Sequence, residues 1–111
     1  MYVVNSFSVS MLPVDCDFAK VSFTKITLEA ARRLLRSRSY TSAVNHKDTA
    51  VHFSNLLDGD IGFHRTSVVL KECDDILLGQ YKGPRLDEDV SLLPEGSVFD
   101  WYHITFTTSL I

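Results

Sequence analysis

His46 is the side chain of this sequence best suited to acid–base chemistry at neutral pH. The ordinary pKa of an imidazole is about 6.5, so the group can donate a proton under physiological conditions. His46 also stands just before a stretch expected to be helical, where free backbone amides attract an anion. The alternative is a loop histidine with one hydrogen bond, and His52, His64 and His103 show how little a histidine alone indicates.

Two arginines and a glutamate form a second group of candidates. The guanidinium groups of Arg65 and Arg85 can contact phosphate with two hydrogen bonds each and neutralise charge in a phosphoryl-transfer transition state. Glu88 follows shortly after Arg85 and can orient that guanidinium or accept a hydroxyl proton. Taken singly, each of the three is better explained as a solvated surface group.

Common metal-binding and nucleotide-binding signatures are absent from the sequence. It contains no Dx[DN]x[DN]G loop, HExxH helix, GxSxG elbow, Walker loop or GxGxxG turn. Cys16 and Cys73 lack CxxC spacing, and we expect both to be reduced thiols. We therefore expect no metal and no cofactor.

The composition is typical of one globular domain spanning residues 1–111, with 45% hydrophobic and 23% charged residues. The formal net charge of -3 argues against coating long nucleic acid, because counterion release needs many Lys and Arg side chains. A small anionic ligand needs only a local basic cluster. No apolar run approaches the roughly 20 residues of a membrane-spanning helix, and the start lacks a signal-peptide pattern, so we expect a cytoplasmic protein without membrane contact.

The hydrophobic pattern predicts the elements that must position these side chains. Strands are expected over 2–5, 18–26, 66–70, 76–81 and 98–106, and two helices are expected after the caps Thr27 and Asp48, the second stopping near Gly59. A hairpin turn at 72–75 should make 66–70 and 76–81 antiparallel neighbours, 37–45 should be a polar link, and 82–97 a long loop. The expected fold class is α/β (α+β), a single domain with a mixed, mostly antiparallel sheet of about five strands flanked by helices.

The order of short segments resembles the viral anti-CRISPR ring nucleases. The likeness spans nearly the whole chain and rests on YVVNSFSVSML at 2–12, NHKDTA at 45–50, Arg65, and GQYKGPRLDE at 79–88. The chain departs from the family's usual pattern at Asn45 and Asp89, where glycine is usual. Asn and Asp are the residues that best replace glycine at positive φ, so we expect both turns to be kept.

This resemblance implies a two-fold homodimer that binds cyclic tetra-adenylate. It implies cleavage to linear diadenylates with 2′,3′-cyclic phosphate ends, which would erase the signal of a type III CRISPR defence. The reaction would use the ring's own 2′-hydroxyl as nucleophile and so require no metal. By the resemblance, the catalytic residues are His46 as general acid, Arg85 and Glu88, and the ligand-binding residues are Asn5, Ser8, Arg65 and Gln80.

Two other functions stay open at this point. A non-catalytic protein that sequesters a cyclic oligonucleotide predicts tight binding without product. A structural or regulatory dimer, whose surface rather than a pocket is functional, predicts no stabilisation by nucleotides.

Overall fold

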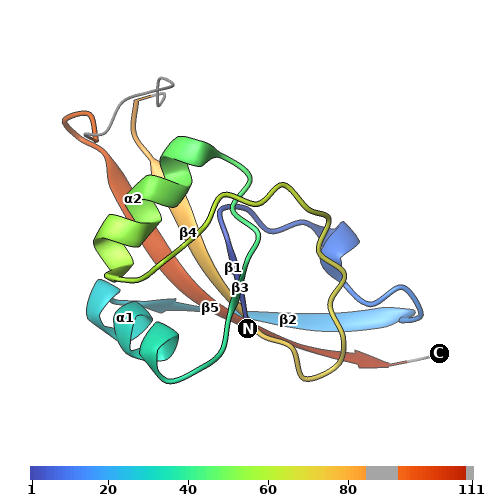
Figure 1. The fold of residues 1–111 in the computed structure, drawn as a ribbon. Coiled ribbons are helices and arrows are strands. Elements are labelled where there is room, and N and C mark those ends of the chain that lie inside the picture. The colour runs from blue at the N-terminus through green and yellow to red at the C-terminus, as the bar shows by residue number, and fades with distance from the viewer. Residues whose placement is uncertain (85–92, 110–111) are drawn as a thin grey trace.

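The computed structural model describes residues 1–84 and 93–109 of the chain. The elements follow one another as β1 (Tyr2–Val4), the 3-10 helix η1 (Val9–Met11), β2 (Phe18–Ile26), α1 (Leu28–Arg36), β3 (Thr41–Ser42), α2 (Lys47–Leu57), β4 (Ile76–Lys82) and β5 (Val98–Ser109). All five strands belong to one sheet with the order β2-β5-β4-β1-β3 (Figure 1).

The sheet is mixed, with most of its paired residues antiparallel. Strand β5 is antiparallel to both neighbours, with nine residue pairs to β2 and seven to β4. Strand β1 is parallel to both neighbours, with three residue pairs to β4 and two to β3. The predicted fold class is confirmed: a single α+β domain with a five-stranded mixed sheet and two helices.

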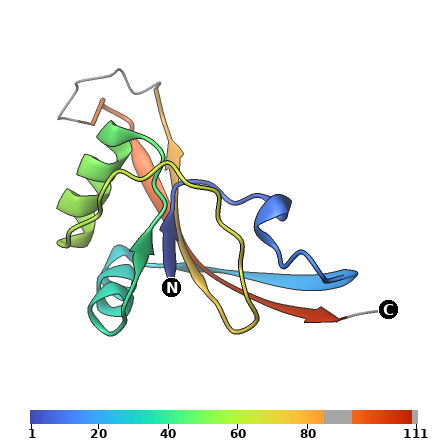
Figure 2. The same ribbon diagram turned by 45° about the vertical axis from the view of Figure 1, so that its right-hand side comes forward.

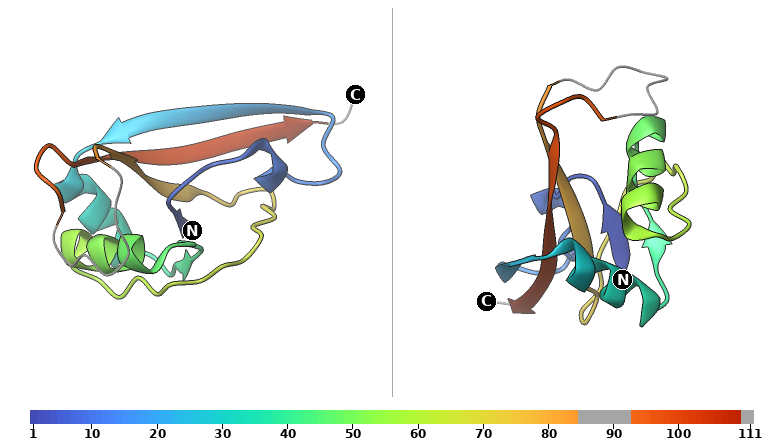
Figure 3. Two further views of the ribbon diagram at one scale, coloured as in Figure 1. Left: turned by 90° about the horizontal axis from the view of Figure 1, so that it is seen from above. Right: turned by 90° about the vertical axis from the view of Figure 1, so that its left-hand side faces the viewer.

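Each face of the sheet is covered by different segments. Helices α1 and α2 lie on one face and η1 lies on the other (Figure 2). Because neighbouring strand residues point to opposite faces, Val3 joins the core under the helices and Val4 joins the second core. Strands β2 and β5 continue as a two-stranded ribbon past the ends of the other strands (Figure 3).

Helix α1 begins as the sequence indicates. The Thr27 hydroxyl accepts a hydrogen bond from the backbone N–H of Ala30 at 3.1 Å, which caps the helix. Ala31 and Leu35 then form its buried face. No helix in the described ranges is both long and apolar enough to cross a membrane.

The predicted strand at 66–70 is wrong. This stretch is irregular, although Val68 and Leu70 are buried in the core on the η1 side of the sheet. Its backbone is held by a hydrogen bond from the Leu70 N–H to the Met11 carbonyl at 2.8 Å. The β-rich composition of this run suggested a strand, but Val68 and Leu70 fill the second core without pairing with a neighbouring strand. Strand β4 consequently pairs with β5 and β1 instead of forming the predicted hairpin.

Two predictions around α2 also need correction. The helix begins at Lys47 with His46 at the N-cap position, so Asp48 lies in its first turn and does not cap it. The stretch expected to be a polar link contains the short strand β3, which pairs with β1. Two paired residues are too few to give a recognisable strand pattern in the sequence.

Candidate functional site

The carboxyl ends of the parallel strands β1, β3 and β4 lie along one edge of the sheet, where α2 begins (Figure 1). This edge carries Asn5 directly after β1, His46 shortly after β3, and Gln80 near the end of β4. In open sheets with parallel strands, ligands usually bind outside the carboxyl ends of the strands. The structure therefore brings three of the predicted site residues to the edge where a ligand is most expected.

His46 is exposed and occupies the N-cap of α2, with extended backbone angles of φ -128° and ψ 130°. Its carbonyl accepts the first helical hydrogen bond, from the Ala50 N–H at 3.0 Å. Its imidazole makes no capping hydrogen bond to the helix. The ring is therefore available to a ligand, and the first amides of the helix lack carbonyl partners within the helix.

Asn45 and Asn5 form a reciprocal pair of hydrogen bonds beside His46. The Asn5 side-chain amide donates to the Asn45 side-chain oxygen at 2.9 Å, and the Asn45 backbone N–H donates to the Asn5 side-chain oxygen at 3.3 Å. Asn45 does not adopt the positive φ that its place in the family pattern suggested. The sequence marked Asn45 only as a replacement for glycine, so its bonds to Asn5 were not foreseen.

Arg65 reaches the same edge through a segment that runs beside β3. Val44 forms a parallel bridge with Phe63, and the His64 N–H donates to the Val44 carbonyl at 2.8 Å. Asn45 and Arg65 then line one open hollow of about 260 Å³, together with Thr66 and Ser67. Arg65 is exposed and forms no ion pair with another described residue, so its guanidinium is available to an anion.

Gly79 fixes the distance between α2 and the sheet. A Cβ atom at this position would lie 2.4 Å from Cζ of Phe53 and 2.6 Å from Cζ3 of Trp101, far inside van der Waals contact. The glycine therefore lets the Phe53 ring of α2 rest directly on β4. A glycine within a strand pattern is a recognisable signal of such close approach, but the sequence reasoning did not use it.

The side chains of Gln80 and Ser8 form hydrogen bonds with residues close to them in the sequence. Gln80 is exposed, and its side-chain amide donates to the Tyr81 carbonyl at 3.3 Å. The Ser8 hydroxyl caps η1 by accepting from the Ser10 N–H at 3.3 Å. No hydrogen bond among the described residues joins either side chain to His46 or Arg65. Arg85, Glu88 and Asp89 lie outside the described residues.

A charged group of three residues lies where β4 and β5 approach their shared loop. Lys82 Nζ lies 2.7 Å and Lys25 Nζ 3.6 Å from the Asp100 carboxylate. The hydrogen bond from Lys82 is the main reason that the pKa of Asp100 lies below its usual value. The same bond raises the pKa of Lys82.

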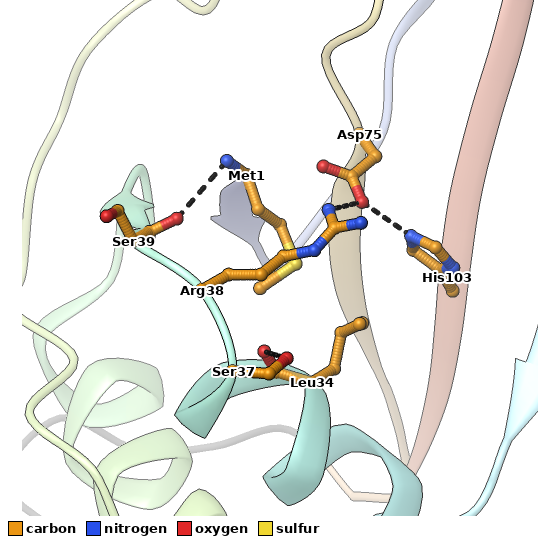
Figure 4. A network of polar contacts seen from close by, with 7 residues as sticks. All are labelled: Met1, Leu34, Ser37, Arg38, Ser39, Asp75 and His103. Carbon is orange, nitrogen blue, oxygen red and sulfur yellow. Dashed lines mark hydrogen bonds and ion pairs between the residues drawn. The ribbon is translucent and has the colours of Figure 1, made fainter.

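A second polar network lies at the amino end of β4, the opposite end of the strand from Gln80. The buried Asp75 carboxylate accepts a hydrogen bond from Arg38 and lies 2.7 Å from Nε2 of His103 (Figure 4). It joins the segment after α1 to strands β4 and β5. Because none of the predicted site residues belongs to it, we interpret it as a structural network.

The described residues contain no group of three or more His, Cys, Asp or Glu side chains that could hold a metal ion. Metal independence is an expectation that a chelator experiment must test.

The structure thus defines a small α+β domain whose polar side chains gather at the carboxyl ends of parallel strands and at a helix N-terminus. The chain belongs to the STIV B116-like family, which matches residues 1–100. It is 29% identical over 77 residues to Uncharacterized protein 26 of Sulfolobus islandicus filamentous virus, isolate Iceland/Hveragerdi, an alignment covering 69% of this chain. The alignment covers 64% of that relative, less than two thirds of its length.

A solved structure shares the fold. B116 of Sulfolobus turreted icosahedral virus superimposes with a TM-score of 0.78 and 21% sequence identity, covering 93% of this chain and 96% of B116. Both relatives come from Sulfolobus viruses, so the family is a viral one. At this level of identity, the likeness to B116 establishes the fold alone.

Proposed function

We propose that the chain is a metal-independent ring nuclease that cleaves cyclic tetra-adenylate to linear diadenylates and so switches off type III CRISPR signalling. The resemblance of the ordered segments motivates the substrate, and membership of a family found in Sulfolobus viruses supports a role against host defence. Such an enzyme would act in the cytoplasm of the infected cell. The observation that carries the proposal is that the His46 imidazole is exposed at the start of α2 and makes no capping hydrogen bond to the helix.

His46 has the position that a general acid needs. In the proposed reaction the 2′-oxygen of one adenylate forms a bond to the adjacent phosphorus, and the bond from phosphorus to the 5′-oxygen breaks. His46 donates a proton to the departing 5′-oxygen, and the 2′-hydroxyl loses its proton to a base or to water. The products are a 2′,3′-cyclic phosphate and a 5′-hydroxyl.

Positive charge for the phosphate comes from Arg65 and from the first amides of α2. Arg65 lines the same hollow as Asn45, the residue directly before His46. The Arg65 guanidinium and the first amides of α2 can therefore face one phosphodiester. The resemblance adds Arg85 and Glu88 as active-site residues, and Asn5, Ser8 and Gln80 as further ligand contacts. A basic pocket of this kind reconciles an anionic ligand with a net charge of -3.

The proposal includes a two-fold homodimer. Large apolar side chains are exposed on β2 and on the segment before it: Val9, Val14, Phe18 and Phe23. Strand β2 is also an edge strand, with β5 on one side only. Exposed apolar patches and unpaired edges favour association with another chain. Two copies would supply two His46 and two Arg65 side chains, which suits a ring with its own two-fold axis.

The test is cleavage of labelled cyclic tetra-adenylate in excess chelator, with linear products resolved from the intact ring. Wild type and His46→Ala are compared with His64→Gln. His64 is the other exposed histidine, and glutamine keeps a side-chain N–H donor where the His64 ring nitrogen lies 3.2 Å from the Ser42 carbonyl. We expect diadenylate from wild type and from His64→Gln, and a loss of about 100-fold or more in His46→Ala.

The other outcomes identify the alternatives. If wild type binds the intact ring tightly and forms no product, the protein sequesters the ring and is not a nuclease. If wild type forms no product and shows no thermal shift with the ring, the structural dimer is favoured. Activity that disappears with chelator would contradict the metal-free reaction.

A further inference from the structure

The hydrogen-bond ladder between β1 and β3 ends in a side chain. The Thr41 N–H donates to the Met1 carbonyl at 2.9 Å, and the Ala43 N–H donates to the Val3 carbonyl at 2.8 Å. At the next step the Asn45 N–H donates to the side-chain oxygen of Asn5 at 3.3 Å. The Asn5 carboxamide therefore extends the parallel ladder by one rung beyond the paired strands.

A second bond closes this rung from the other direction. The Asn5 amide nitrogen donates to the Asn45 side-chain oxygen at 2.9 Å, so the two residues are joined through two hydrogen bonds. We propose that Asn5 and Asn45 form an amide clamp whose role is to position His46, an inference that rests on the proposed function. Both asparagines are then positioning residues.

The clamp acts on His46 through Asn45, the residue directly before it. The helix fixes His46 through its carbonyl, which accepts from the Ala50 N–H, while its side chain makes no capping bond. The clamp fixes both the backbone and the side chain of Asn45, the preceding residue. The direction of the imidazole therefore depends on helix α2 from one side and on the clamp from the other.

The same bonds limit what Asn5 can offer a ligand. One lone pair of its side-chain oxygen and one amide hydrogen are engaged by Asn45, which leaves one N–H and one lone pair for other contacts. The resemblance assigns Asn5 to ligand binding, whereas the clamp predicts that its main effect is on the rate of the chemical step. An error of about 1 Å in the position of a catalytic group can cost about 100-fold in rate.

The test compares kcat and KM for cyclic tetra-adenylate cleavage in Asn5→Ala, Asn45→Ala and the double variant. Asn55→Ala is the matched control, because Asn55 is an exposed asparagine on the same helix that follows the clamp. We expect each clamp variant to lower kcat about tenfold or more with little change in KM. Asn5→Ala removes both hydrogen bonds, whereas Asn45→Ala removes only the side-chain bond and keeps the backbone N–H that donates to Asn5. The double variant should therefore be no slower than Asn5→Ala.

A second comparison repeats Asn45→Ala in the His46→Ala background. If the clamp acts through the imidazole, the substitution should cause no further loss of rate there. The proteins are compared below their unfolding temperatures, so that a change in stability does not enter the rates.

The inference is overturned if KM rises while kcat is unchanged, which would make the asparagines ligand contacts. It is also overturned if kcat does not change, or if Asn45→Ala causes the same loss with and without His46. In those cases the proposed function stands, provided that wild type cuts the ring and His46→Ala does not. A wild type that leaves the ring intact overturns the proposed function and the clamp's role together.

Discussion

Replacing Gly79 by alanine tests whether the close contact between α2 and β4 sets the geometry of the domain. The added methyl group would lie 2.4 Å from Cζ of Phe53 and 2.6 Å from Cζ3 of Trp101, whereas ordinary contacts begin near 3.4 Å. About 1 Å of movement is therefore needed, by two rings that are both buried. Overpacking of this kind costs about 1–3 kcal/mol. We expect Gly79→Ala to lower the free energy of unfolding by that amount.

Urea denaturation followed by circular dichroism measures this loss, and a thermal scan should show a decrease of roughly 4–8 °C for each kcal/mol. Gly62→Ala is the matched control, because a Cβ at Gly62 meets nothing within 4 Å. The control should stay within about 0.5 kcal/mol of wild type. If Gly79→Ala is as stable as Gly62→Ala, the helix does not rest on β4 at this distance and the argument fails.

Two further predictions concern polar groups away from the hydrophobic contact. The pKa of Asp100 is lowered mainly by the hydrogen bond from Lys82. The Asp100 carboxylate therefore contributes to stability above the usual carboxyl pKa of 3.8, and this contribution is lost as the pH falls through the lower pKa of Asp100 in the folded protein. Asp100→Asn should therefore be less stable than wild type at pH 7, and thermal scans should show this difference shrinking below about pH 4. The buried His52 Nε2 atom has no hydrogen-bond partner among the described residues, so His52→Leu should increase the free energy of unfolding by about 1 kcal/mol, measured by urea denaturation. A clear loss of stability in that variant would show that the imidazole has a role the described contacts do not reveal.

The sequence predicted those elements whose signals are local. Thr27 caps α1, and the alternating pattern of 18–26 is strand β2 with the predicted bounds. A capping hydroxyl and a two-residue period act within a few residues, so they can be recognised without knowing the rest of the fold. By contrast, 66–70 has the β-rich composition of a strand, but its backbone is held by a hydrogen bond to the Met11 carbonyl instead of a sheet neighbour.

The candidate site was predictable by residue type and less so by arrangement. His46 stands out as an imidazole before a helix, and the structure places it at the N-cap. Its relation to Arg65 depends on the bridge between Val44 and Phe63, which no local pattern indicates. Asn45 is adjacent to His46 in sequence, but its partner Asn5 lies 40 positions away.

If the proposed function holds, residues other than His46 determine where the proposed acid lies. The start of α2 is fixed by three contacts between distant segments: the asparagine pair to β1, the bridge from Val44 to Phe63, and the Phe53 ring on Gly79. The asparagine pair lies directly beside His46, whereas the contact between Phe53 and Gly79 lies further along the helix and positions α2 as a whole. If the proposed function holds, loss of the asparagine pair should affect rate more than stability. Crowding at Gly79 should reduce stability first and affect the rate only as far as the helix moves.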